Sequence, residues 1–144
     1  MIRSLGRDHD RGSSTLELAI WGLPLLLFIG LLIAGGRMAL AGNAVQSAAF
    51  AAAREATIAR DSSQAQNAGE EGATFSLNSN GVRCASRSVA VDTSAFDQPL
   101  GTTGSVTATL TCTVSLSDAA LPGLPGAVDI TRSAISPVDP YRQR

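Results

Sequence analysis

A charge-free apolar segment constrains this chain more than any other feature. The 19 residues from Leu18 to Gly36 carry no charged side chain and lie between Glu17 and Arg37. A helix rises about 1.5 Å per residue, so the segment spans roughly 28 Å, close to the ~30 Å hydrocarbon core of a bilayer. The segment therefore predicts a membrane-spanning helix. Glu17 lies at its edge and needs a partner or polar headgroups, because an unpaired charge in a membrane costs free energy.

The flanking charges predict how this helix is oriented. Arg3, Arg7 and Arg11 precede the apolar segment, which favours a cytoplasmic N-terminus and an extracytoplasmic C-terminal part. An ordinary signal peptide, with a short apolar core and a small-x-small cleavage site, is the alternative. The segment here is longer, and the sequence 34–36 is only a mediocre site of that kind. The sequence therefore favours a single-pass anchor at the cell membrane.

The helical pattern continues past the membrane segment, so one helix is expected from residue 14 to about residue 60. Pro24 lies inside it and predicts either a harmless bend or a flexible point. Small side chains then recur at every third or fourth position: Val45, Ala48, Ala52, Ala56 and Ala59. This alanine stripe indicates close packing of helix backbones, or only the high helix propensity of alanine. Phe50 and Ile58 lie on another face and are expected to cover the extracellular domain.

A second helix and a small sheet are expected after this long helix. Asp61, followed by Gln64, predicts an N-cap and a helix from Ser62 to about Leu77, although Gly69 and Gly72 weaken its pattern. Beyond residue 81 the apolar period changes to two. Three strands are predicted: one with Val82, Cys84 and 88–92, one over 106–116 with a hydroxyl-rich exposed face, and one over 128–135.

These elements predict an α+β fold. A long N-terminal transmembrane helix continues into an amphipathic alanine-rich helix and is followed by a small antiparallel β-sheet domain. The predicted boundaries are a cytoplasmic leader over 1–12, a transmembrane helix over 13–37, and an extracellular stalk with the short second helix over 38–78. A small β domain over 82–136 and a polar tail over 137–144 complete the chain.

The chain has two cysteines, Cys84 and Cys112, and both fall in predicted extracytoplasmic strands. A disulfide between them would close a loop of 29 residues, which is worth about 3–4 kcal/mol in the chain-entropy treatment. Two buried free thiols are the alternative. A metal site is disfavoured because no histidine lies near either cysteine.

Catalytic chemistry is not expected. The only histidine, His9, lies in the predicted leader, and the serine- and threonine-rich strands have no histidine or lysine nearby to activate a nucleophile. Asp92 and Asp97 fit turn-forming roles better than a pair of catalytic carboxylates. A net charge of −1 argues against nucleic acid as a partner. We therefore expect no enzyme activity, no cofactor and no metal.

The N-terminal motif resembles the processing site of type IV prepilins and pseudopilins. It consists of Gly12, the four residues 13–16 and Glu17, directly before the apolar helix. Cleavage after Gly12 would create a new amino group at Ser13. The ammonium of a neighbouring subunit would then satisfy the carboxylate of Glu17.

Taken as a whole, the chain resembles a TadE-like protein of the tight-adherence (Tad) pilus system. The resemblance rests on this motif, on the segments 42–49 and 53–56, and on the β-rich C-terminal part with its cysteine pair and the ending 136–142. It implies a minor pilin or pseudopilin that is processed by a prepilin peptidase. Its implied partners are membrane lipid and other pilin, pseudopilin or Tad-assembly subunits. An aromatic residue often follows the glutamate in such proteins, and here Leu18 does. The alternative is an uncleaved, membrane-anchored binding or adhesion module that uses loops such as 97–104.

Overall fold

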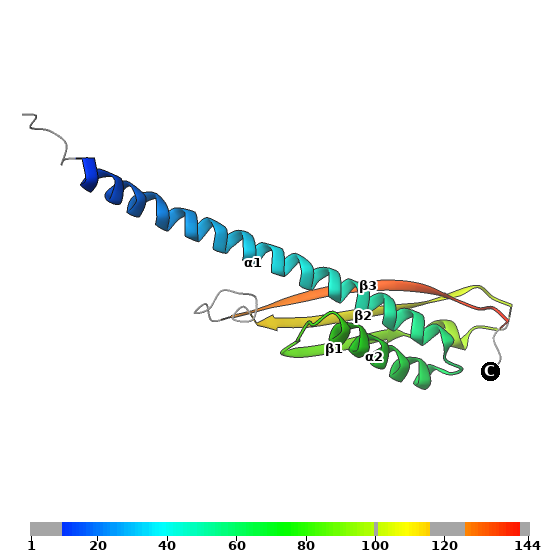
Figure 1. The fold of residues 1–144 in the computed structure, drawn as a ribbon. Helices are drawn as coiled ribbons and strands as arrows, with labels where there is room; N and C mark the ends of the chain where they lie inside the picture. The colour runs from blue at the N-terminus through cyan, green and yellow to red at the C-terminus, as the bar shows by residue number, and fades with distance from the viewer. Residues whose placement is uncertain (1–9, 100, 116–125, 142–144) are drawn as a thin grey trace, which may run out of the picture.

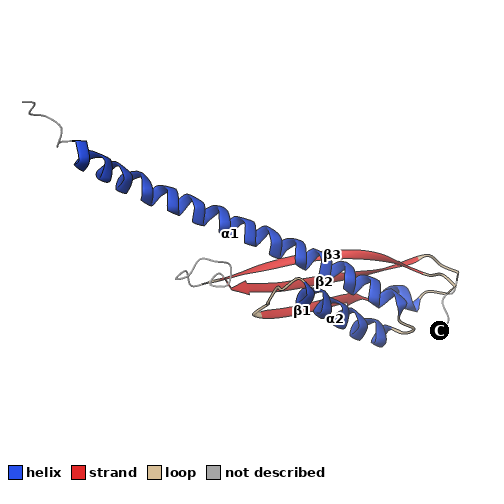
Figure 2. Cartoon of the chain, in the orientation of Figure 1, coloured by secondary structure: helices blue, strands red, loops and turns tan. Residues whose placement is uncertain are grey.

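A long helix projects from a small domain that contains a second helix and a three-stranded antiparallel sheet (Figures 1 and 2). The computed structural model describes residues 10–99, 101–115 and 126–141, with side-chain environments from residue 17 onward. Most of the predicted leader, including His9, and residues 116–125 and 142–144 lie outside the described residues. The predicted α+β fold class is confirmed.

The first helix, α1, extends from Asp10 to Ile58 and continues through Pro24 without interruption. Its two halves have different environments. The N-terminal half projects away from the domain, and the C-terminal half packs on the sheet and on the second helix (Figure 1). The expectation of one helix over about 14–60 is therefore confirmed.

The second helix, α2 (Ser62–Ser79), begins where the sequence predicts. The backbone N–H of Gln64 and the hydroxyl of Ser63 donate to Oδ1 of Asp61 at 2.8 and 2.7 Å. The hydrogen bond from Gln64, followed by that from Ser63, lowers the pKa of Asp61 below its usual range. Asp61 is thus an N-cap whose ionised form satisfies one of the free N–H groups at the start of α2.

The sheet consists of β1 (Ser86–Asp92), β2 (Gly104–Ser115) and β3 (Ala127–Val138), in that spatial order, with a short 3-10 turn, η1 (Ser94–Asp97), between β1 and β2. Both strand pairs are antiparallel, and Cys112 of β2 faces Ile130 of β3 in the register. Burial alternates along β2, so one face of the sheet packs on the helices and the other faces away from them. The third strand extends to Val138, beyond its expected end.

The expectation that Val82 and Cys84 belong to the first strand was wrong. The backbone N–H of Val82 donates to the carbonyl of Leu77, after a turn in which Gly81 has a φ of +68°. Val82 therefore closes the C-terminus of α2 and does not extend the sheet. Pairing with β2 begins only at Ala85, whose N–H donates to the carbonyl of Thr113 at 2.8 Å.

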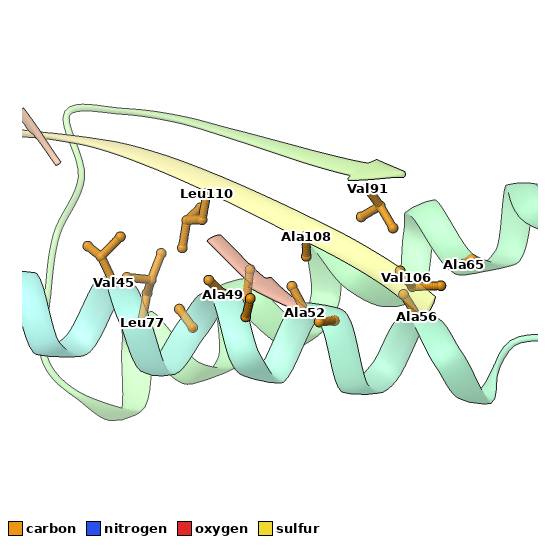
Figure 3. Packing of buried hydrophobic residues seen from close by; sticks show 14 of the residues in the cluster. Val45, Ala49, Ala52, Ala56, Ala65, Leu77, Val91, Val106, Ala108 and Leu110 are labelled. Carbon is orange, nitrogen blue, oxygen red and sulfur yellow. The ribbon is translucent and has the colours of Figure 1, made fainter. Parts of the chain in front are cut away.

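The core lies between the alanine stripe of α1, the inner face of the sheet and α2. Val45 and Ala56 of α1 point toward Leu110 and Val106 of β2, and all four are fully buried (Figure 3). A methyl group at Gly69 of α2 would lie 3.5 Å from the carbonyl oxygen of Ala52. The glycines that weakened the helical pattern of α2 are therefore positions where α2 and α1 approach closely. The close-packing interpretation of the stripe is supported.

Phe50 and Ile58 do not cover the domain, contrary to expectation. Their side chains are 56% and 69% exposed. The sheet and α2 occupy the alanine face of α1, so side chains on the opposite face remain outside the core.

Candidate functional site

The projecting half of α1 is the candidate functional surface. Its large apolar side chains are mostly exposed; Leu18 is 77% and Trp21 70% exposed, and the others are Ile20, Leu23, Leu25, Leu26, Leu27, Phe28, Ile29, Leu31, Leu32 and Ile33. By length and composition, the described helix from Glu17 onward can cross a membrane. A continuous apolar surface of this size is unfavourable in water. Lipid or other apolar helices must therefore cover it.

The predicted processing and assembly residues lie at the start of this surface. The backbones of Gly12 and Ser13 lie in the first turn of α1. Glu17 is exposed and follows Ser13 by four residues, which places the two positions on the same side of the helix. The structure thus brings Ser13 and Glu17 to one side of α1. Their roles in processing and assembly stay predictions.

The predicted disulfide between Cys84 and Cys112 is present, with a Cα–Cα distance of 5.3 Å. Cys112 is fully buried in β2, and Cys84 lies in the connection between α2 and β1. The bond fastens this connection to the central strand. The α2–β1 connection lies at the end of the domain nearest the projecting half of α1, which we call the membrane-proximal end (Figure 1).

The membrane-proximal end also contains a pocket that the sequence analysis missed. Arg37 of α1 and Arg83 of the α2–β1 connection both line it. The two arginines are 46 positions apart in the sequence, and they line the same pocket because α2 runs back along α1. Periodicity carries no signal for such a long-range pairing.

The opposite, distal end of the domain has a polar hollow of about 500 Å³. It is lined by Asp92, Ser94, Ala95, Gln98, Thr103, Gly104, Ser105 and Thr107. The backbone N–H of Ser94 donates to Oδ1 of Asp92 at 3.0 Å, and this bond is the main reason that the pKa of Asp92 is lowered. Asp92 therefore has the turn-forming role expected of it.

The outer face of the sheet is hydroxyl-rich, as predicted for the central strand. Thr113 accepts a hydrogen bond from Ser86 of β1 at 2.7 Å and donates one to Asp129 of β3 at 2.6 Å. The hydroxyls of Thr111 and Thr131 lie 3.0 Å apart. These side chains thus join the three strands across the sheet. Among the described residues there is no group of three or more histidine, cysteine or carboxylate side chains that could hold a metal ion.

Comparison with known protein families gives a match over part of the long helix α1. Residues 12–54 match the family model described as TadE-like protein. The match begins at Gly12, contains Glu17 and the apolar segment, and ends within the alanine stripe. It confirms the resemblance predicted from the sequence. No curated protein and no solved structure gives a match.

Proposed function

We propose, from the TadE-like match over residues 12–54, that this chain is a minor pilin or pseudopilin. It would serve as a structural subunit in the assembly of a Tad-type pilus or secretion apparatus at the cell membrane. The observation that carries the proposal is the division of α1 into an exposed apolar half and a half that is buried in the chain's own domain. Such a helix can reside in a bilayer first and pack against other apolar helices later.

The packing of the alanine stripe limits which surface is available for assembly. Ala48, Ala52 and Ala56 are fully buried by the sheet and α2 of the same chain. They are therefore not available to neighbouring subunits. Contacts between subunits would use the exposed segment 18–33 and the outward face of α1, where Phe50 lies.

Glu17 and the residues before it supply a specific assembly contact. A prepilin peptidase that cuts after Gly12 would leave an ammonium group on Ser13. In a low-dielectric environment this ammonium and the Glu17 carboxylate of a neighbouring subunit attract each other far more strongly than in water. The proposed topology has a cytoplasmic N-terminus and an extracytoplasmic domain, in line with the arginines of the leader. We propose no catalytic role, because the chain has no lysine and its one histidine lies in the leader.

One observation favours the second candidate, an uncleaved membrane-anchored binding or adhesion module. The polar hollow lies at the distal end of the domain, where a ligand would approach from outside. This alternative requires neither cleavage after Gly12 nor contacts through the helix. The two functions therefore differ in whether the carboxylate of Glu17 is needed: the pseudopilin uses it for assembly, and the binding module does not.

Neutralising Glu17 tests the proposed function. Glu17→Gln removes the carboxylate but leaves the apolar segment intact, so the variant should still fractionate with membranes. It should co-purify poorly with pilus or secretion subunits after cross-linking. Glu55→Gln is the matched control, because Glu55 is exposed on the same helix but lies beside the domain, next to α2.

The two variants separate the candidates. A lower cross-linked yield for Glu17→Gln alone supports a pseudopilin. Equal yields from the wild type and both variants would leave Glu17 as an ordinary interfacial residue and favour the binding module. Loss of membrane insertion in Glu17→Gln would contradict the view that the apolar segment inserts by itself.

A further inference from the structure

The two outer strands of the sheet differ in how their free edges are covered. β2 is the central strand, so β1 and β3 each have one edge without a neighbouring strand (Figures 1 and 2). In an antiparallel pair, the backbone groups of successive residues point alternately toward the partner strand and toward the free edge. Unpaired N–H and C=O groups along such an edge can pair with another extended chain.

The edge of β3 is closed. The side chain of Gln46 on α1 donates to the carbonyl of Ser133 at 3.2 Å, and the side chain of Arg132 donates to the carbonyl of Thr131 at 2.9 Å. These bonds show that the odd-numbered residues of β3 point their backbone groups toward the free edge. Pro137 is one of these residues and has no N–H to offer. The addition of a further strand to β3 is therefore disfavoured.

The edge of β1 is open at Arg87 and Val89. The side chain of Gln66 on α2 donates to the carbonyl of Val91 at 3.4 Å, so the odd-numbered residues of β1 are those that face the edge. The register of β2 with both neighbours gives the same assignment. No described residue forms a hydrogen bond with the edge-facing N–H and C=O groups of Arg87 or Val89. These backbone groups are available to another strand.

A groove lies beside this open edge, between β1 and α2. It has a volume of about 510 Å³, and Arg87 lines it from the strand. The α2 side chains that line it include Glu70, Glu71 and Phe75, and Phe75 is 77% exposed. No ion pair joins either carboxylate to another described residue. An extended chain at the edge of β1 would place alternate side chains in this groove, where two carboxylates outweigh one guanidinium group.

The packing of α2 on β1 indicates which part of the groove each of these side chains would meet. A methyl group at Gly69 would lie 2.8 Å from Cγ2 of Val91, so a residue paired with Val91 is close to the level of Glu70. α2 runs in the opposite direction to β1, and Arg87 lines the groove together with Phe75. A chain antiparallel to β1 would therefore meet Glu70 first and Phe75 later. A basic residue followed by apolar residues at alternate positions fits this order.

The membrane anchor favours a different subunit over a second copy of this chain as the occupant. β1 and β3 both run antiparallel to β2, and β1 starts at the membrane-proximal end (Figure 1). A second copy in the same membrane would therefore present its outer strands parallel to β1. Parallel pairing is less stable per residue than antiparallel pairing, and the edge of β3 is closed. An antiparallel segment must come from a chain with another topology.

We propose that the open edge of β1 binds an extended segment of a partner subunit, which adds to the sheet as an antiparallel strand. The segment places a basic side chain toward Glu70 and an apolar one toward Phe75. In this mode of recognition, backbone hydrogen bonds supply affinity and alternate side chains supply specificity. The proposal rests on the proposed function only in naming a subunit of that assembly as the partner. It requires neither cleavage after Gly12 nor a role for Glu17.

Titration of the full-length protein in nanodiscs with a synthetic peptide tests the proposal. The probe is acetyl-Thr-Arg-Thr-Val-Thr-Phe-Thr-amide, whose arginine, valine and phenylalanine share one face of a strand. Fluorescence anisotropy of the labelled peptide measures binding, and amide hydrogen exchange of the protein locates it. The N–H groups of Arg87 and Val89 should become protected, whereas the N–H of Ser133 on the closed edge should not change.

Two N-methylated peptides separate strand addition from other modes of binding. A methyl group on the nitrogen of the central valine removes a donor that faces β1, and should weaken binding by about tenfold or more. A methyl group on the nitrogen of a neighbouring threonine faces away from β1 and should have little effect. In the protein, Arg87→Pro removes an edge-facing N–H and should also weaken binding, whereas Arg87→Gln should not. Circular dichroism and an intact disulfide show that both variants are folded.

The carboxylates of α2 test the specificity of the groove. Glu70→Gln/Glu71→Gln should weaken binding of the arginine peptide by about threefold or more. Glu55→Gln is the matched control, because Glu55 is exposed next to α2 but does not line the groove. A peptide with glutamate in place of arginine should bind the wild type more weakly than the arginine peptide does.

Several results would overturn the proposal. They are the absence of saturable binding of the arginine peptide, equal weakening by the two N-methyl groups, and unchanged binding in Glu70→Gln/Glu71→Gln. Protection of Ser133 in place of Val89 would put the peptide on the edge of β3 and contradict the proposal as well. The proposed function fails separately, if Glu17→Gln cross-links to pilus or secretion subunits as the wild type does, since the peptide titration involves no assembly.

Discussion

Replacement of Gly69 by alanine tests how α1 and α2 pack, because two effects of known size oppose each other there. Alanine in a helix interior is favoured over glycine by about 1 kcal/mol. The added methyl would lie 2.8 Å from Cγ2 of Val91, which is closer than such contacts allow. Val91 is buried and branched at Cβ, so it has little room to move. Overpacking of this kind costs about 1–3 kcal/mol. Gly69→Ala should therefore lower the free energy of unfolding by about 1 kcal/mol.

Gly42→Ala is the matched control for this substitution. Its new methyl would lie 3.5 Å from Nη2 of Arg132, an ordinary contact. Only the helix-propensity term then remains, so Gly42→Ala should stabilise the protein by up to about 1 kcal/mol. The same chemical change is thus expected to have opposite signs at two helix positions in one domain.

Thermal unfolding of the full-length protein in nanodiscs, followed by far-ultraviolet circular dichroism, measures both variants. A loss of about 1 kcal/mol corresponds to a midpoint lower by roughly 4–8 °C for a domain of this size. Gly69→Ala should cost less when Val91 is also replaced by alanine, because the clashing methyl is then absent. A Gly69→Ala variant as stable as the wild type, or more stable, would refute the close approach of the two helices at this position.

Two further predictions concern the stability of the domain. Cys84→Ser/Cys112→Ser opens a loop with a sequence separation of 28 and should lower the free energy of unfolding by about 3.6 kcal/mol in denaturant titrations; an unchanged midpoint would contradict the disulfide's role. Asp61→Ala should destabilise α2, whereas Asp61→Asn keeps the N-cap acceptor and should destabilise it much less. Because the pKa of Asp61 is lowered in the folded state, its carboxylate stabilises the fold above the unfolded pKa. That contribution is lost as the pH falls below about 4, and the loss should be absent in Asp61→Asn.

The long helix could be predicted because its signals are local. The charge-free segment and the three-to-four spacing of the alanine stripe both depend on near neighbours in the sequence. The N-cap at Asp61 is local in the same way, and it lies where the pattern predicts. The pairing of Cys84 with Cys112 could be predicted from the sequence because the chain contains no other cysteine.

The remaining features depend on contacts between distant residues. The spacing of two between Val82 and Cys84 is typical of a strand. The N–H of Val82 instead donates to the carbonyl of Leu77 at the C-terminus of α2. Gly69 is unfavourable by helix propensity alone, and only the neighbouring Val91 and Ala52 explain why a residue without a side chain fits best there. Arg37 and Arg83 line the same pocket because α2 returns along α1, which no periodicity encodes.

The intact mass of the protein extracted from the membranes of its native host tests the central claim most directly. The account predicts a chain that begins at Ser13, with or without a methyl group on its new amino terminus. Gly12→Ala should slow this cleavage, since the peptidase must accept the residue before the cut bond. A native protein that retains Met1 to Gly12 throughout assembly would contradict the pseudopilin account and favour the uncleaved membrane-anchored module.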